Sequence, residues 1–254
     1  MARIRIGTSG YQYRHWRGVL YPDGLAQRLW LPWYATVFDT VELNATFYRL
    51  PAADAVDRWR EVAPPRFTFA VKGSRYVTHM KRLLDAGPGL RRFFAPVGHL
   101  GPKLGPVLWQ LPPNMKPDLA RLHRFLARLP PGRHAVEFRD PAWYSGETCD
   151  VLDAHGAAFC EQDNVKRPPP RLTGGFRYVR FHGTAGRYAG RYGPDALRGP
   201  AQSYLASAAR GVPVFVYFNN DLGGHAVHDA LDLLALVGEE RPAFPAHEAP
   251  APGP

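Results

Sequence analysis

The sequence predicts an α/β protein built as a single (β/α)8 barrel of the TIM type. The chain has 254 residues, the usual length of one such barrel. Short β-rich runs alternate with helical patterns, which predicts parallel strands, and eight such units predict closure into a barrel. We take residues 1–238 as the barrel domain and residues 239–254, rich in proline and alanine, as a flexible C-terminal tail.

The predicted strands are short apolar runs bounded by turn residues. They cover Arg3–Gly7, Phe38–Leu43, Phe67–Val71, Pro106–Leu111, His134–Phe138, Ala157–Glu161, Phe176–Phe181 and Val212–Phe218.

Most segments between these runs carry apolar residues at helical spacing. The sixth connection, from Gln162 to Gly175, is the exception, because the three prolines at 168–170 exclude a regular helix. Asp54 and Asp118 are expected to cap their helices. The predicted helices cover Leu25–Val37, Asp54–Val62, Gly89–Leu100, Asp118–Leu129, Thr148–His155, Asp195–Arg210 and Gly224–Val237.

The composition excludes several classes of protein. The N-terminus alternates charges with isoleucines and therefore lacks the apolar region of a signal peptide. The longest apolar run, Val212–Phe218, is too short to span a bilayer. The two cysteines, Cys149 and Cys160, are too few for a disulfide framework and lack metal-type spacing. We expect a cytoplasmic protein with no membrane partner, and the sequence leaves its oligomeric state open.

The formal net charge of +10 has two interpretations. A basic surface is typical of proteins that bind nucleic acid or phosphate. However, only five of the 32 basic residues are lysines, and the arginines lie in a chain rich in proline, glycine and alanine. General compositional bias therefore explains the charge equally well.

Polar residues follow each predicted strand, where the active site of a barrel lies. In strands with period-two alternation, Glu42, Glu137 and Arg180 share the inward face, while Val41 and Val136 face the helices. Charges at such positions are costly unless paired, which favours a ligand site. The candidate catalytic residues are Glu42, Glu137 and His182. The candidate ligand-binding residues are Thr8, Ser9, Tyr11, Asn44, Lys72, Arg75, Gln110, Arg139, Asp163, Arg180, Asn219 and Asn220.

Several long motifs resemble those of the YecE-like family, also known as domain of unknown function seventy-two. The resemblance covers roughly residues 4 to 237 and implies a TIM barrel, but that family has no settled activity. Tyr11 stands where tryptophan is commoner in the family. The motifs are Ile6–Tyr13, Thr40–Arg49, Phe69–Lys72 with Thr78 and His79, Gln110–Pro113, Tyr178–Gly183 and Tyr217–Asp221.

The chemistry of these residues favours an anionic ligand. Lys72, Arg139 and Arg180 come from different strands, and arginine matches phosphate or carboxylate with paired donors. A single divalent metal held by Glu42, Glu137 and His182 is an alternative that we do not favour, because cations surround these groups. The sequence leaves the identity of any cofactor unknown. Cys160 lies in an apolar strand, so a covalent cysteine mechanism has little support.

We therefore predict an enzyme, a hydrolase or another phosphate-ester-directed enzyme, that acts on a phosphate-bearing substrate such as a nucleotide or nucleic acid. The cations would hold the anion, Glu42 or Glu137 would act as base, and His182 as acid or ligand. The alternative is a non-catalytic protein that binds single-stranded nucleic acid through alternating arginine and tyrosine in Gly186–Gly193. A third interpretation is a carbohydrate-active hydrolase that uses Glu42 and Glu137 as a carboxylate pair.

Overall fold

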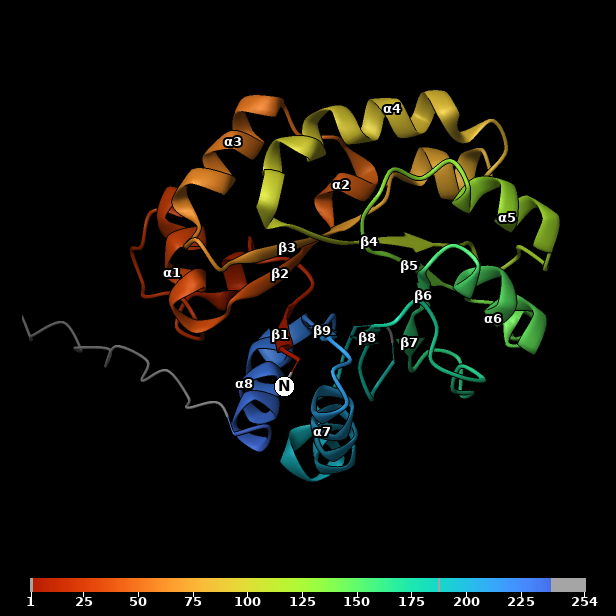
Figure 1. Ribbon diagram of the computed structural model, residues 1–254. Helices are drawn as coiled ribbons and strands as arrows, with labels where there is room; N and C mark the ends of the chain where they lie inside the picture. Colours follow the sequence, from red (N-terminus) through yellow and green to blue (C-terminus); the bar gives the residue numbers. More distant parts are fainter. Residues whose placement is uncertain (1, 187, 239–254) are drawn as a thin grey trace, which may run out of the picture.

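The computed structural model describes residues 2–186 and 188–238. Strands and helical segments alternate along the chain, and Figure 1 shows the helices on the outside of the strands. The α/β class is confirmed, and every pair of neighbouring strands is parallel. None of the helices in the described ranges is long and apolar enough to cross a membrane.

The strands lie where the apolar runs place them, with small shifts at their ends. The exception is the sixth run, which is divided by Cys160 into two short strands. The strands are β1 Ile4–Thr8, β2 Thr40–Leu43, β3 Thr68–Lys72, β4 Leu104–Gln110, β5 His134–Glu137, β6 Ala157–Phe159, β7 Glu161–Gln162, β8 Arg177–Phe181 and β9 Val214–Phe218.

The strands form two parallel sheets, and the closed barrel predicted from the sequence is not confirmed. One sheet has the order β2-β3-β4-β5-β6 and the other β1-β9-β8-β7. The sixth run changes partner at Cys160, because β6 pairs with β5 whereas β7 pairs with β8. Between β1 and β2, one isolated bridge joins Ser9 to Glu42, and the Gly10 amide donates to the Glu42 carbonyl at 2.8 Å.

Gly7 permits the close approach of β1 to β2. A Cβ atom at this position would lie 2.2 Å from the carbonyl oxygen of Thr40, far inside van der Waals contact. The Thr8 amide and hydroxyl both contact the Tyr34 hydroxyl at 3.0 Å, and that hydroxyl lies 3.0 Å from the same Thr40 carbonyl. Side-chain contacts thus join these two strands where the backbone ladder is absent.

Helices lie in all seven predicted segments, with shifted ends, and a further short helix at Ala45–Tyr48 was not predicted. Asp118 caps its helix as predicted and accepts from the Arg121 amide at 2.9 Å. The predicted cap at Asp54 is wrong. The helix begins at Ala53, its N-cap residue is Ala52, and Asp54 lies inside it. The sixth connection contains no helix, as the prolines predict. The helices are α1 Trp30–Val37, α2 Ala45–Tyr48, α3 Ala53–Val62, α4 Ala86–Val97, α5 Leu119–Leu126, α6 Gly146–Asp153, α7 Gly193–Ala209 and α8 His225–Leu236.

Two apolar clusters fill the protein. The larger lies between the strands and the helices and includes Val41 and Val136. The smaller combines inward-facing side chains from both sheets, so the two sheets enclose a common interior. Glu42, Glu137 and Arg180 continue this inward face at the carboxyl ends of their strands. The smaller cluster contains Ala70, Leu108, Ala135, Ala158, Cys160, Phe176, Tyr178, Phe215 and Tyr217.

Candidate functional site

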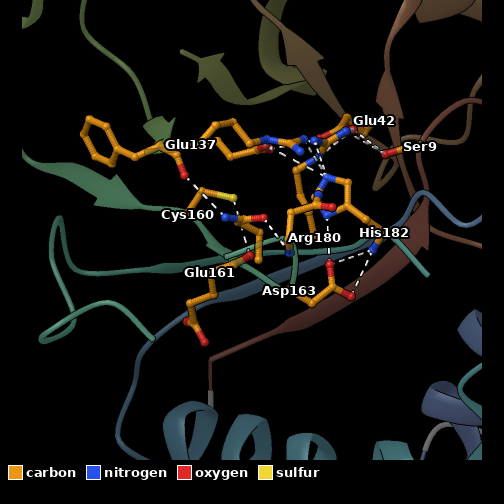
Figure 2. A network of polar contacts seen from close by, with 12 residues as sticks. Ser9, Glu42, Glu137, Cys160, Glu161, Asp163, Arg180 and His182 are labelled. Carbon is orange, nitrogen blue, oxygen red and sulfur yellow. Dashed lines mark hydrogen bonds and ion pairs between the residues drawn. The ribbon is translucent and has the colours of Figure 1, made fainter. Parts of the chain in front are cut away.

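Arg180 on β8 is the centre of the polar interior. Its side chain is fully buried, and its guanidinium binds Glu42 of β2 at 2.9 Å and Glu137 of β5 at 2.6 Å. Figure 2 shows the carboxylates and the guanidinium pointing toward one another. Burying a charge this deeply is costly unless it is paired, and here one cation is shared by two carboxylates from the opposite sheet.

Glu42 is satisfied at both carboxylate oxygens. The Ser9 hydroxyl and the Arg180 guanidinium donate to Oε1, and the Tyr178 hydroxyl donates to Oε2 at 2.6 Å. Burial by itself raises the pKa of Glu42, but Arg180 and these hydroxyl donors outweigh it, and the pKa lies below its ordinary value. Glu42 therefore stays ionised and acts as a partner of Arg180.

Arg139 and His182 extend this arrangement toward solvent. Arg139 donates to Glu137 through Nε and contacts His182 Nε2 at 3.0 Å through Nη2, and its side chain is 17% exposed. Arg180 Nη1 contacts the same His182 nitrogen at 3.1 Å. We call Arg180, Glu42, Glu137, Arg139 and His182 the Arg180 cluster.

The contacts of His182 fix its tautomer. Arginine can only donate, so Nε2 must carry a lone pair that accepts from Arg139 and Arg180. The proton then sits on Nδ1 and is donated to Asp163 at 3.0 Å. Burial lowers the pKa of His182, and Arg180 lowers it further against the opposing effect of Asp163. The ring is neutral at pH 7 and has an orienting carboxylate.

Lys72, the last residue of β3, is a second cation of the interior. The residue is 9% exposed, and its ammonium lies 4.4 Å from the centre of the Phe47 ring. The Thr46 hydroxyl donates to the Lys72 carbonyl at 2.7 Å, but within residues 2–186 and 188–238 the ammonium makes no hydrogen bond or ion pair. Burial, and then Arg180, lower the pKa of Lys72 to about 8.

Comparison with known proteins places the chain in a family. Residues 5–254 match the family model described as protein of unknown function DUF72. The chain belongs to the DUF72 family. The description names no reaction, and a fold alone does not determine one, so the chemistry of this DUF72 protein depends on the side chains of its site.

Individual relatives of this DUF72 protein cover different parts of it. The UPF0759 protein YecE of Escherichia coli is 33% identical over 47% of this chain and 45% of that protein, so the match spans about half of YecE. The UPF0759 protein YunF of Bacillus subtilis is 27% identical, with 93% of this chain and 95% of YunF covered.

Solved structures of DUF72 proteins have the same fold. The protein TM1631 of Thermotoga maritima is 30% identical, with a TM-score of 0.83, and 93% of this chain and 99% of that chain are covered. A DUF72 protein of Enterococcus faecalis superposes with a TM-score of 0.80 at 19% identity, with 94% and 96% covered.

The remaining predicted site residues lie in different environments. Asn220 is buried and donates to the Gly190 carbonyl and to Asp229, which holds a loop. Asn44 and Gln110 are half-buried, Asn219 is nearly buried, and Arg75 is exposed. Tyr11 is buried in the outer apolar cluster. Thr8 contacts Tyr34, as described above.

Three tyrosines in this DUF72 site were not among the predicted site residues. Tyr178 donates to Glu42, and the Tyr13 hydroxyl donates to the Ser9 carbonyl at 2.7 Å. The Tyr192 hydroxyl donates to Asp163. Period-two alternation could have identified Tyr178, which shares a strand face with Arg180. Tyr13 follows an irregular segment and carries no such signal, whereas Tyr192 belongs to Gly186–Gly193, the segment whose alternating arginines and tyrosines predicted nucleic-acid binding.

The arginine-tyrosine segment Gly186–Gly193 packs back onto the fold. Arg191 forms an ion pair with Asp232 at 2.7 Å, and the Tyr192 amide donates to Asp229 of α8. Arg187 lies outside the described residues. The described arginine and Tyr192 of this segment are therefore occupied by intramolecular partners.

Proposed function

We propose that this DUF72 protein is an enzyme that acts on a phosphate-bearing substrate, with nucleotides and nucleic acids as the first classes to test. The observation that carries the proposal is the position of His182 Nε2, which accepts from Arg139 Nη2 while Asp163 orients the ring. A neutral, oriented imidazole beside a partly exposed arginine is suited to proton transfer on an anionic substrate.

The charges give each cation a different role. Glu42 and Glu137 carry two negative charges, and Arg180 offsets one of them inside the protein. When Arg139 and Lys72 are added, these five side chains have a net charge of +1. Asp163, on the other side of the His182 ring, balances that charge. Attraction for an anion is therefore local, at Arg139 and Lys72, and Arg180 serves to hold the two carboxylates.

Substrate binding would make His182 available as a general base. A phosphate oxygen that accepts from Arg139 Nη2 would remove one of the two donors to His182 Nε2. Because the other donor, Arg180 Nη1, also donates to Glu137 at 2.6 Å, a water or substrate hydroxyl would then replace it at Nε2 and give up its proton there. Asp163 would stabilise the imidazolium that forms, as carboxylates do for paired histidines. Glu42 and Glu137, which the sequence suggested as bases, would position Arg180.

We also propose that the two sheets form one TIM-type barrel around this site. The inner apolar cluster shared by both sheets, the Ser9–Glu42 bridge and the Arg180 ion pairs support this arrangement. In such a barrel the Arg180 cluster would lie at the face where active sites of this architecture occur.

The test is a thermal-shift and turnover panel of inorganic phosphate, nucleotides and oligonucleotides. A ligand at a hundred times its Kd adds about 2.7 kcal/mol, which is several degrees in melting temperature. Arg139→Met should lose the shift, His182→Gln should bind but not turn over, and the control Arg92→Met, an exposed residue of α4, should behave as wild type.

Two outcomes would contradict this proposal. If no phosphate compound shifts the melting temperature, the anion site does not exist. If oligonucleotides bind with steep salt dependence but His182→Gln changes nothing and no turnover occurs, the non-catalytic nucleic-acid-binding alternative holds.

A further inference from the structure

Lys72 is the one cation of the interior whose charge the protein leaves without a carboxylate partner, among the residues that the structure describes. Glu42 and Glu137 are the nearest candidates, but Arg180 binds both of them and Arg139 binds Glu137 as well. The amine instead lies against the Phe47 ring. A lysine used only for charge balance would be expected to contact a carboxylate directly.

The surroundings of Lys72 increase the share of its neutral form. Arg180 and Arg139 repel the ammonium, Glu137 and Glu42 attract it, and burial outweighs the attraction, so the pKa falls to about 8. About one tenth of the amine is therefore unprotonated at pH 7. An ordinary surface lysine has only about one part in 2,500 in that form.

His79 is a neutral imidazole that contacts the same aromatic ring as Lys72. Its ring packs edge-on against Phe47 at 5.0 Å between centres, the ring that Lys72 also contacts. Burial and then Lys72 lower the pKa of His79 to about 4, so it remains unprotonated at pH 7. The Thr78 hydroxyl lies 2.9 Å from His79 Nδ1 and orients the ring.

We propose that Lys72 is a nucleophile that forms an imine with the aldehyde or ketone group of a substrate. A buried, desolvated amine at the end of a strand, flanked by other cations, is the usual environment of imine-forming lysines. The further expectation that this carbonyl substrate also bears a phosphate rests on the proposed function above.

The step balances without any further reactant. The Nζ lone pair attacks the carbonyl carbon, a C–N bond forms, and the C=O π electrons move to oxygen. The two protons of the neutral amine leave with that oxygen as water, and a C=N double bond remains. His79 could relay these protons, since its ring contacts the same aromatic side chain as the amine.

The test is reductive trapping in the wild-type protein. Glyceraldehyde 3-phosphate, or glyceraldehyde without phosphate, is added at pH 7 with cyanoborohydride, and the modified lysine is located by peptide mass. We expect Lys72 to be labelled at least ten-fold faster than Lys81, Lys103, Lys116 or Lys166. Lys103 is a useful internal control, because its ammonium is held by the Arg60 and Ala63 carbonyls.

The pH dependence gives an independent measurement. The labelling rate of Lys72 should rise about ten-fold from pH 6 to pH 7 and level off above pH 8, whereas rates at surface lysines should rise up to about pH 10. Lys72→Met should remove the fast label, and Lys81→Met should leave it. Label spread over the other lysines with Lys72 unmodified would overturn the proposal, whether or not the variants fold.

The two aldehydes separate this proposal from the proposed function. Faster labelling by the phosphate ester, slowed by inorganic phosphate, supports both. Equal rates for the two aldehydes support the imine and contradict the anion site. A thermal shift with phosphate while Lys72 remains unlabelled supports the anion site and overturns the imine.

Discussion

Arg180 Nη1 lies 2.6 Å from Glu137 Oε2, and neither side chain is exposed to solvent. The same guanidinium binds Glu42, so removing it leaves two buried carboxylates without their cation. We predict that Arg180→Met lowers the free energy of unfolding by about 3–5 kcal/mol, measured by urea denaturation at pH 7.

Two further variants separate the loss of charge pairing from the loss of packing. Adding Glu42→Gln and Glu137→Gln to Arg180→Met should restore part of the stability, because no uncompensated charge then remains. Arg58→Met removes an exposed ion pair with Asp54 and should leave stability unchanged. If the triple variant is no more stable than Arg180→Met, packing rather than charge explains the loss.

Acid should destabilise the protein through Glu137. Burial raises its pKa, but Arg180 and Arg139 lower it more, so the pKa in the folded state lies well below the ordinary 4.5. The unfolded chain then takes up a proton first as the pH falls, and the stability present above pH 4.5 is lost below it. Glu137→Gln should reduce the fall of the urea midpoint between pH 5 and pH 3. If the midpoint of the variant depends on pH as steeply as that of the wild type, this prediction is contradicted.

The pKa of His182 should respond in opposite directions to its two kinds of neighbour. Arg139 lowers it and Asp163 raises it, so Arg139→Met should move the titration to higher pH and Asp163→Asn to lower pH. Histidine resonances in an NMR titration measure this, with His182→Gln as the assignment control. A shift of the same sign in both variants would refute the assigned contacts.

Gly7 should tolerate no side chain. Gly7→Ala places a methyl group against the Thr40 carbonyl and should cost about 1–3 kcal/mol, since a backbone atom cannot rotate away. Gly146→Ala is the matched control, because a Cβ there meets nothing within 4 Å. Thermal unfolding of both variants compares them directly; equal stability would mean that β1 can move away from β2.

The sequence predicts those features that depend on local patterns. Apolar runs and period-two alternation place the strands and turn Glu42, Glu137 and Arg180 toward one interior. The Asp118 cap follows from local hydrogen bonding, but Asp54 shows that an acidic residue near a helix start has several competing places in the first turn. The division of the sixth apolar run at Cys160 has no local signal, because it depends on which neighbouring strand each part of the run can pair with.

The roles within the site depend on contacts that no local pattern contains. Alternation shows that Arg180 faces inward, but not that both carboxylates share it while Lys72 has neither. The Tyr192 contact with Asp163 joins a loop to a strand end far along the chain. The folded structure determines which of several chemically similar groups form such contacts, and the local sequence does not.

The strand order also determines when each sheet can form during synthesis on the ribosome. The sheet β2 to β6 is contiguous in sequence, so it can form while the rest of the chain is still being made. β1 has its ladder partner in β9, with Ile4 beside Val214, near the end of the chain. The first strand to be synthesised can therefore pair only after the last strand has been made. Arg180, which joins the two sheets, is synthesised shortly before β9.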